Sequence, residues 1–239
     1  MSAIASSFVI CMPLASARLS WGHLFGNQAP VELEVGFGKG MFLLSEAAAR
    51  PQVNFVGLEV AGKYHHHTLQ RVEGRRLQNV RLIHGEAGEV ISRHVADTSL
   101  QAIHIYFPDP WHKKRHKKRR LFGPGFLYHA ARTLRRNGAL YIATDYAEYF
   151  DSIVERVEAC GYFGRLLQSP FVERWQASFR EGRKTTACGT APAEQPRLPQ
   201  SPPPPGGAQA ATDLPLTHYE RKYRREGRRI YAAHYVVQR

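Results

Sequence analysis

Between residues 31 and 160, short runs of β-branched and aliphatic residues alternate with longer stretches in which apolar residues recur at helical spacing. The short runs have the length of buried strands, and the longer stretches are typical of amphipathic helices. The pattern predicts strands at 31–35, 54–60, 80–84, 100–107 and 138–144. It predicts helices at 41–50, 63–74, 87–94, 126–136 and 146–160, followed by a last strand at 229–237.

Strands that alternate with helices are joined by right-handed crossovers and form a mainly parallel sheet. We therefore expect an α/β fold with helices on both faces of that sheet. In such folds ligands gather at the carboxyl ends of the strands. The residues that follow each predicted strand are therefore the candidates for chemistry.

Composition divides the chain into one domain and two peripheral segments. Residues 179–212 are rich in Pro, Gly and Ala, which cannot bury a core, and we expect a disordered insertion there. Residues 1–20 are expected to form a flexible N-terminal segment. The ranges 21–178 and 213–239 then make up a single domain.

The charge distribution indicates an anionic partner. The formal net charge is +13, and two short segments carry ten of these excess charges. Residues 105–122 hold seven Lys or Arg and one Asp, a net charge of +6, and residues 220–229 hold six Lys or Arg and two Glu, a net charge of +4. Such patches fit nucleic acid or an acidic membrane surface.

The cysteines and the apolar segments favour a reducing, cytoplasmic location. Cys11, Cys160 and Cys188 are scattered without a short paired spacing, so neither a disulfide framework nor a Cys-based zinc site is indicated. No run of eighteen apolar residues occurs that could span a bilayer. No Lys or Arg precedes Arg18 in the apolar start, which argues against a signal peptide.

Glycines at 36, 38 and 40 follow the first predicted strand and open a helix. Glycine lets the backbone adopt positive φ and approach a ligand closely. Met41 stands where a dinucleotide site would have its third glycine, and Glu34 lies two residues before the turn. A carboxylate there would repel a pyrophosphate but attract the cationic amino group of a ligand such as S-adenosylmethionine.

Two further carboxylates end the next two strands. Glu59 lies 23 positions past Gly36, where doubly wound folds bind the two ribose hydroxyls. Glu86 ends the third strand, where it could meet an adenine amino group. Each of them alone could equally cap a helix at the surface. Three carboxylates at successive strand ends favour a methyl-donor site.

Residues 107–120 read FPDPWHKKRHKKRR and follow the fourth strand. The prolines on both sides of Asp109 restrict the backbone, so the carboxylate is presented from a stiff loop, which suits a catalytic site. Trp111 could pack beneath the loop or stack on a base. Seven of the eight positions 113–120 are Lys or Arg. Such a run is often a solvated surface, but at this edge it would meet the phosphates of a polynucleotide.

Three consecutive histidines, His65, His66 and His67, resemble a metal-binding cluster. Adjacent residues of a helix point in different directions, so we interpret them as a solvated face and expect no metal site. Asp151 and Glu155 are interpreted as ordinary carboxylates of a helix surface.

Five motifs, in this order, resemble the bacterial tRNA (guanine-N7)-methyltransferase family: LEVGFGKG (33–40), FVGLEV (55–60), FPDPWHKKRHKKRRL (107–121), ATDY (143–146) and THYE (217–220). The resemblance covers about residues 20–165 and 214–238. The PDPW-to-KRR segment is specific to this family, whereas the glycine turn is shared with many methyltransferases. The usual Asp-Ala of the family is Glu86-Ala87 here, the Pro-rich segment is longer, and the N-terminal region is short.

The resemblance implies a Rossmann-like class I methyltransferase fold, in which S-adenosyl-L-methionine methylates N7 of guanine 46 in the variable loop of tRNA. It implies that the donor is bound by Glu34, Gly36, Gly38, Glu59, Glu86 and Asp109, and that Asp109 is also the catalytic residue. The guanosine would be contacted by Lys113, Asp145, Thr217, His218, Tyr219 and Glu220. The tRNA backbone would be contacted by Arg115, Lys117, Lys118, Arg119 and Arg120. The resemblance implies no metal, no membrane and no obligate protein partner.

Two alternatives stay open at this point. A non-catalytic RNA-binding protein could keep this fold without its chemistry, although the presence of all the acidic strand-end residues argues against it. A methyltransferase of another nucleic acid would share the donor site. Donor-binding calorimetry distinguishes a non-catalytic RNA-binding protein from an enzyme. Mapping the methylated position distinguishes a methyltransferase of another nucleic acid from one that acts on tRNA.

Overall fold

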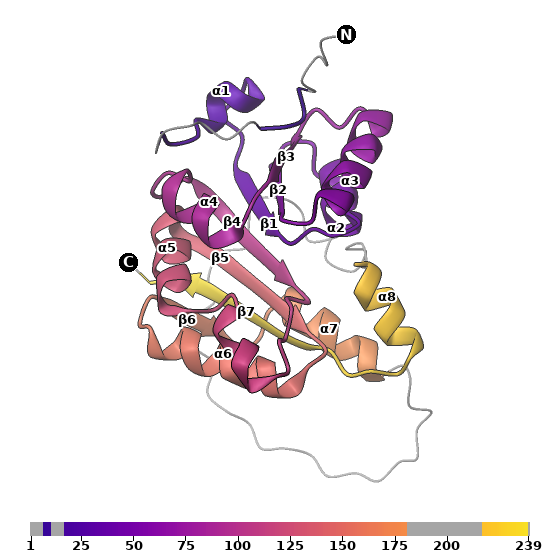
Figure 1. The fold of residues 1–239 in the computed structure, drawn as a ribbon, viewed down its shortest axis with the longest axis vertical. Coiled ribbons are helices and arrows are strands. Elements are labelled where there is room, and N and C mark those ends of the chain that lie inside the picture. The colour runs from indigo at the N-terminus through magenta and orange to yellow at the C-terminus, as the bar shows by residue number, and fades with distance from the viewer. Residues whose placement is uncertain (1–6, 11–16, 181–216, 239) are drawn as a thin grey trace.

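The structure is a computed structural model that describes residues 7–10, 17–180 and 217–238 (Figure 1). Its centre is a seven-stranded sheet in the order β3-β2-β1-β4-β5-β7-β6. The strands are β1 (Val31–Val35), β2 (Asn54–Glu59), β3 (Val80–His84), β4 (Leu100–Tyr106), β5 (Leu134–Thr144), β6 (Phe163–Leu166) and β7 (Tyr231–Val237). Strands β1 to β5 run parallel, whereas β7 is antiparallel to both β5 and β6. The predicted mainly parallel sheet is confirmed.

Helices cover both faces of the sheet, as predicted. They are α1 (Trp21–Phe25), α2 (Met41–Ala49), α3 (Gly62–Arg75), α4 (Ala87–Arg93), α5 (Pro124–Thr133), α6 (Ala147–Ala159), α7 (Pro170–Arg180) and α8 (His218–Arg225), with a 3₁₀ helix, η1 (Lys114–Arg119), after β4. Side chains of α1, α4, α5 and α6 share one core with Leu33. Those of α2 and α3 pack on the opposite face with Phe55, and α7 packs beside β7. Side chains alternate along β1, so Glu34 lies on the face opposite to Leu33.

The start of β5 differs from the prediction. The sequence pattern predicts Arg135 and Arg136 in a helix, but α5 ends at Thr133 and β5 begins at Leu134. The pairing of β4 with β5 shifts register at this point, and Asn137 has a φ of 59°. The two arginines therefore lie in the irregular start of β5. Arginine favours helices, but pairing with β4 places these two residues in the strand. The sequence pattern does not predict β6 or α7.

Part of the N-terminal segment lies against the domain. Val9 bridges to Leu82 of β3, and both Ile10 and Leu19 are buried. For these described residues the expectation of a flexible segment is wrong, because their apolar side chains complete the core. The expected insertion at 179–212 begins within α7, and its residues beyond Arg180 lie outside the described part of the chain.

Candidate functional site

The turn between β1 and α2 is fixed by contacts with β2 and α3. Gly36, Gly38 and Gly40 all have positive φ, at 73°, 50° and 65°. The N–H of Gly38 donates to Oε2 of Glu59 at 2.9 Å. A Cβ at position 40 would lie 2.4 Å from Cγ2 of Thr68 in α3, so glycine is required there by packing as well as by backbone conformation.

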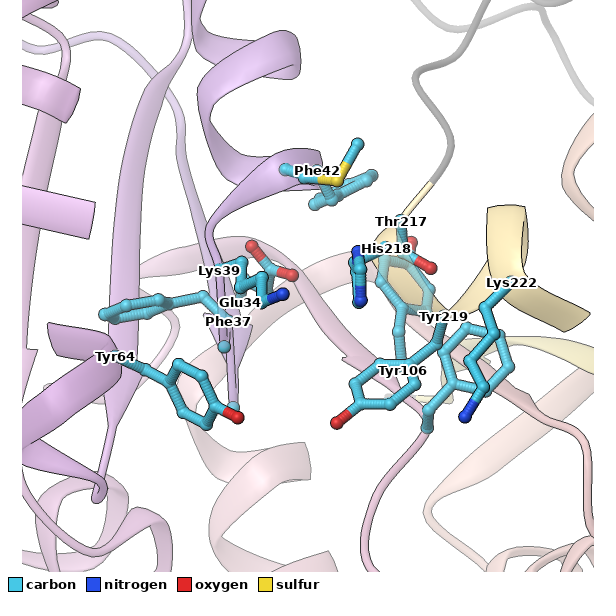
Figure 2. A pocket seen from close by; sticks show the side chains of 14 residues that line it. Glu34, Phe37, Lys39, Phe42, Tyr64, Tyr106, Thr217, His218, Tyr219 and Lys222 are labelled. Carbon is cyan, nitrogen blue, oxygen red and sulfur yellow. The ribbon is translucent and has the colours of Figure 1, made fainter. Parts of the chain in front are cut away.

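A cavity opens at this turn and brings together residues that are far apart in the sequence (Figure 2). From the predicted site its wall contains Glu34, Gly36, Gly38, Thr217, His218 and Tyr219. The rest of the wall is largely aromatic and cationic: Phe37, Lys39, Met41, Phe42, Tyr64, Tyr106, Phe107 and Lys222. The other predicted donor and guanosine contacts, Glu59, Glu86, Asp109, Lys113, Asp145 and Glu220, are not part of this wall.

Glu34 is the acidic group of the cavity. It is 5% exposed, and among the described residues its Oε2 has no hydrogen-bond partner. The pKa of its carboxyl is raised to about 8, chiefly by burial and also by the nearby carboxylates of Glu59 and Glu46, against a backbone hydrogen bond from Leu43 that lowers it. A buried acceptor without a partner favours a cationic donor group in this space. The ammonium group of S-adenosylmethionine fits that requirement.

The other two strand-end carboxylates are bound to backbone N–H groups. Glu59 is 7% exposed, and its two oxygens accept hydrogen bonds from Gly38 and Ala61, each at 2.9 Å. It thereby ties the glycine turn to the start of α3. Glu86 is exposed and caps α4, accepting hydrogen bonds from the N–H groups of Gly88 at 3.0 Å and Glu89 at 2.8 Å. This is the helix-capping role that the sequence leaves open for it, and the adenine contact stays a prediction.

The loop after β4 is strained on both sides of Asp109. Phe107 has a φ of 53° and Trp111 a φ of 44°, which bulky residues rarely adopt. Strain of this kind persists only where the surrounding structure enforces it, and it is concentrated at functional sites. Asp109 is exposed between the two strained residues, and Phe107 lines the cavity. The prolines predict a stiff loop. In the structure, the residue at each end of this loop also has its backbone in the left-handed region.

Arg120 braces this loop. Its Nε donates to the carbonyl of Pro110 at 2.8 Å, and its guanidinium lies 4.5 Å from the centre of the Tyr149 ring. The side chain is only 7% exposed. A phosphate contact does not fit a guanidinium enclosed in this way, so the role expected for Arg120 at the tRNA backbone is corrected to one of loop support.

The other cations of the run form an exposed surface, which we call the basic segment (residues 113–119). No side chain of η1 is buried. Lys117 forms an ion pair with Glu148 of α6, and the Arg119 guanidinium lies 5.1 Å from the centre of the Trp111 ring. Trp111 therefore packs against the basic segment itself.

The THYE motif at 217–220 forms the N-terminal cap of α8. Oγ1 of Thr217 accepts a hydrogen bond from the Glu220 N–H at 3.0 Å, and Oε2 of Glu220 accepts one from the Thr217 N–H at 3.3 Å. This reciprocal pair is a capping box. Glu220 is fully buried and also lies 3.4 Å from Arg174 of α7. The guanosine contact expected for Glu220 does not fit this position, because its carboxylate instead fixes the helix start that lines the cavity.

The start of α8 packs on the strained loop. The Tyr219 ring lies 5.7 Å from the Phe107 ring, between centroids. Burial raises the pKa of the Tyr219 hydroxyl, and the charges of Asp109 and Glu59 raise it further. Asp109 is therefore close enough to Tyr219, a residue of the cavity wall, for its charge to act on that hydroxyl. Asp145, at the end of β5, forms an ion pair with Arg228 at 3.0 Å.

Two aromatic residues of the cavity wall, Tyr64 and Tyr106, belong to no motif that marks them as functional, and a third, Phe37, lies within LEVGFGKG without an expected role. Tyr106 is buried, and its hydroxyl is hydrogen-bonded to Nδ1 of His104 at 2.8 Å. Their positions could have indicated them, because each lies in or just after a strand end or in the glycine turn. Their residue types could not, because buried aromatic residues usually belong to the core.

The three consecutive histidines do point in different directions, but only two of them are solvated. His66 and His67 are exposed, whereas His65 is buried with its ring 6.3 Å from that of Phe37. The interpretation of a solvated face is wrong for His65, because that position of α3 faces the sheet. Within the described ranges no group of three or more His, Cys, Asp or Glu is placed to hold a metal ion. No helix in the same ranges is long and apolar enough to cross a membrane.

The strand order, the reversed β7 between β5 and β6, and the cavity at the carboxyl ends of parallel strands define a class I S-adenosylmethionine-dependent methyltransferase fold. A solved structure described as an antibiotic-related methyltransferase has the same fold. It aligns with a TM-score of 0.53 over 96% of this chain and 96% of its own, at 12% sequence identity.

Sequence comparisons narrow this class to a family. A family model described as "Putative methyltransferase" matches residues 28–189. A tRNA (guanine-N(7)-)-methyltransferase of Alkalilimnicola ehrlichii is 40% identical over 153 residues, which are 64% of this chain and 65% of that protein. One of Pseudomonas entomophila is 39% identical over 164 residues, which are 68% of each chain. The chain belongs to the tRNA (guanine-N7)-methyltransferase family. Its match covers 65% and 68% of the length of these two relatives, and 54% of the length of a relative from Rhodopirellula baltica that is 40% identical.

Proposed function

We propose that this protein transfers the methyl group of S-adenosyl-L-methionine to N7 of guanine 46 in the variable loop of tRNA. The observation that carries the proposal is the shared cavity, in which the buried Glu34 faces the same space as Phe107 of the strained loop and the cap of α8. The relatives named tRNA (guanine-N(7)-)-methyltransferase support the substrate class. We place the reaction in the cytoplasm, with tRNA as the only macromolecular partner that it needs.

The proposed donor contacts differ in how well the structure supports them. Glu34 would accept a hydrogen bond from the donor ammonium group, and the backbone at Gly36 and Gly38 would lie against the donor. Glu59 would bind the ribose hydroxyls, because each of its oxygens keeps a second lone pair beside its backbone hydrogen bond. Glu86 has the weakest support, because its oxygens already cap α4. When bound, the donor supplies a methyl group activated by a positively charged sulfur.

The reaction needs alignment more than proton transfer. Guanine N7 carries an exposed lone pair and holds no proton at neutral pH, so no general base is required. The lone pair forms the new C–N bond while the C–S bond breaks, its electron pair returns to sulfur, and the positive charge passes to the purine. Holding the reactants in line can remove about 7–11 kcal/mol of the barrier. Asp109, held rigidly by its loop, would contact the donor and stabilise the charge that arises on the purine.

The guanosine contacts would come from the α8 cap, Asp145 and Lys113. Thr217, His218 and Tyr219 line the cavity, and the Tyr219 ring, 42% exposed, could stack on a base. Asp145 would reach the guanine only if its ion pair with Arg228 opened or were shared. Lys113 is exposed at the N-terminal end of η1.

The basic segment would hold the tRNA backbone. Arg115, Lys118 and Arg119 are exposed and could contact phosphates directly. Lys117 would exchange Glu148 for a phosphate. Arg120 is left out of these contacts because it is enclosed beneath the loop.

Incubation with labelled donor and unmodified tRNA, followed by chemical cleavage at 7-methylguanosine, tests this function. We expect label in the tRNA and cleavage at position 46 alone. Cleavage at another position would correct the site, and methylation of another nucleic acid instead would correct the substrate. Binding of tRNA without binding of donor would identify an RNA-binding protein and refute the proposal.

A further inference from the structure

One side of α3 carries positive charge beside the cavity. Tyr64, Arg71 and Arg75 follow one another at intervals of seven and four residues, so they share one side of the helix. Nη1 of Arg71 donates a hydrogen bond to the carbonyl of Lys39, which ties this side of α3 to the glycine turn. We call Lys39, Arg71 and Arg75 the α3 stripe.

No carboxylate among the described residues forms an ion pair with the α3 stripe. By contrast, the exposed Arg93 of α4 is paired with Glu89. Glu73, the one carboxylate in the sequence of α3, is two residues from both Arg71 and Arg75 and therefore points to another side of the helix. Burial lowers the pKa of the Arg71 guanidinium, and the nearby Arg75 lowers it further. The two guanidinium groups thus repel each other, and an added anion would relieve that repulsion.

The stripe begins at the cavity and leads away from it. Lys39 and Tyr64 both line the cavity wall, and Figure 2 shows Tyr64 across the cavity from Lys222 of α8. From Tyr64 to Arg75 the helix rises about 16 Å. Helix α3 follows β2 and the basic segment follows β4, with β1 between these two strands. Cationic surfaces therefore flank the cavity on both sides.

We propose that the α3 stripe binds phosphate groups of the tRNA backbone on the side of the cavity opposite to the basic segment. This inference rests on the proposed function and adds a second contact surface to it. Nucleic acid fits this surface better than an acidic membrane does, because the stripe begins at Lys39 in the wall of a concave site that also presents the rings of Tyr64 and Tyr219. Bases stack on such rings, whereas a flat membrane surface would not enter the site.

The salt dependence of tRNA binding tests the inference. Arg75→Gln and the double variant Arg71→Gln/Arg75→Gln are compared with wild type from about 50 to about 200 mM salt. Each lost phosphate contact should reduce the slope of log affinity against log salt by about 0.7–0.9, and the double variant should lose about twice as much. Calorimetry with S-adenosyl-L-homocysteine, the demethylated product, should show that Arg75→Gln keeps wild-type affinity for the donor side of the cavity.

Arg93→Gln is the matched control, because it removes the same charge from a side chain that is 64% exposed, lies on α4 and is already paired with Glu89. A slope for Arg75→Gln equal to that of Arg93→Gln would overturn the inference. So would binding to phosphatidylserine vesicles that depends on Arg75 while the tRNA slope stays unchanged. If the double variant loses binding of S-adenosyl-L-homocysteine and Arg75→Gln keeps it, Arg71 supports the glycine turn. The salt slope of Arg75→Gln would then decide whether the stripe contacts phosphate. Absence of methylation by the wild type would refute the proposed function and leave the comparison of slopes valid.

Discussion

Protonation of Glu34 is expected to control binding of the methyl donor. Before the donor binds, burial raises the pKa of this carboxyl from its usual 4.5 to about 8. The difference corresponds to about 5 kcal/mol against a charged carboxylate in the cavity. At pH 7 the group is therefore about 90% protonated, and a cationic ligand has to bind its minor, ionised form.

Two linked effects follow when an ammonium group binds at Glu34. At pH 7 binding should release close to one proton. Between about pH 5.5 and pH 7.5 the affinity should rise about tenfold per pH unit, because each unit increases the ionised fraction of Glu34 about tenfold. Glu34→Gln should abolish both effects and weaken binding by about 1.5–3 kcal/mol, the contribution of a hydrogen bond to a charged group.

Titration calorimetry with S-adenosyl-L-homocysteine measures both effects, because this product keeps the ammonium group of the donor. Titrations at pH 7 in buffers of different ionisation enthalpy give the number of protons released. Glu89→Gln, which removes an exposed carboxylate from α4, is the control and should behave as wild type. A wild-type titration that releases no proton, with an affinity that stays constant over this pH range, would refute the reasoning.

The same pKa predicts how stability changes with pH. The pKa of Glu34 is higher in the folded protein than in the unfolded chain, so the folded state binds its proton more tightly. The stabilisation from that proton is fully present below about pH 4.5 and is lost as the pH rises through about 8. Both proteins are compared without ligand. As the pH rises from about 4.5 to above 8, the unfolding free energy of wild type should therefore fall by up to about 5 kcal/mol relative to that of Glu34→Gln. Denaturant titrations of both proteins at several pH values check this, and parallel curves would contradict it.

Three further variants test the loop and the basic segment. Asp109→Asn should lower the rate of methyl transfer by about 10²-fold at saturating donor and tRNA, as expected for loss of a group that stabilises transition-state charge, and full turnover would exclude this role. Changing Arg115, Lys117 and Lys118 together to Ala should flatten the salt dependence of tRNA binding by about 0.7–0.9 per contact, as read from binding titrations, with little effect on single-turnover transfer. Arg120→Gln should instead slow transfer and leave that salt dependence at its wild-type slope, because Arg120 supports the loop through Pro110. A reduced slope in Arg120→Gln would return this residue to the phosphate contacts.

The sequence predicts those features that depend on neighbouring residues. Glu34 and the glycine turn follow from a strand, a turn and a helix that are consecutive in the chain, and the structure places them in one cavity wall. The capping box of Thr217 and Glu220 is equally local, and its S/T-x-x-E spacing could have identified Glu220 as a cap. The resemblance to the family instead predicts a substrate contact for Glu220.

Other features of the site could not be predicted from the local sequence pattern, because they depend on contacts between residues that are far apart in the chain. Asp145 is paired with Arg228, which is 83 residues away in the sequence. Arg120 lies among cations that are exposed, and its contacts with Pro110 and with Tyr149 of α6 separate it from them. The prolines around Asp109 indicate a restricted backbone, but they do not indicate the positive φ of Phe107, whose ring packs on Trp175 of α7 and on Tyr219 of α8.

The position of β7 has a consequence for how the protein is made. Within the described residues, β7 is the strand that joins β6 to the rest of the sheet, and it pairs with β5 on its other side. A nascent chain that has not yet released Tyr231–Val237 from the ribosome therefore keeps β5 as an open edge, ready to pair with another chain. Translation that stalls just before this strand should yield an aggregation-prone fragment rather than a smaller working enzyme.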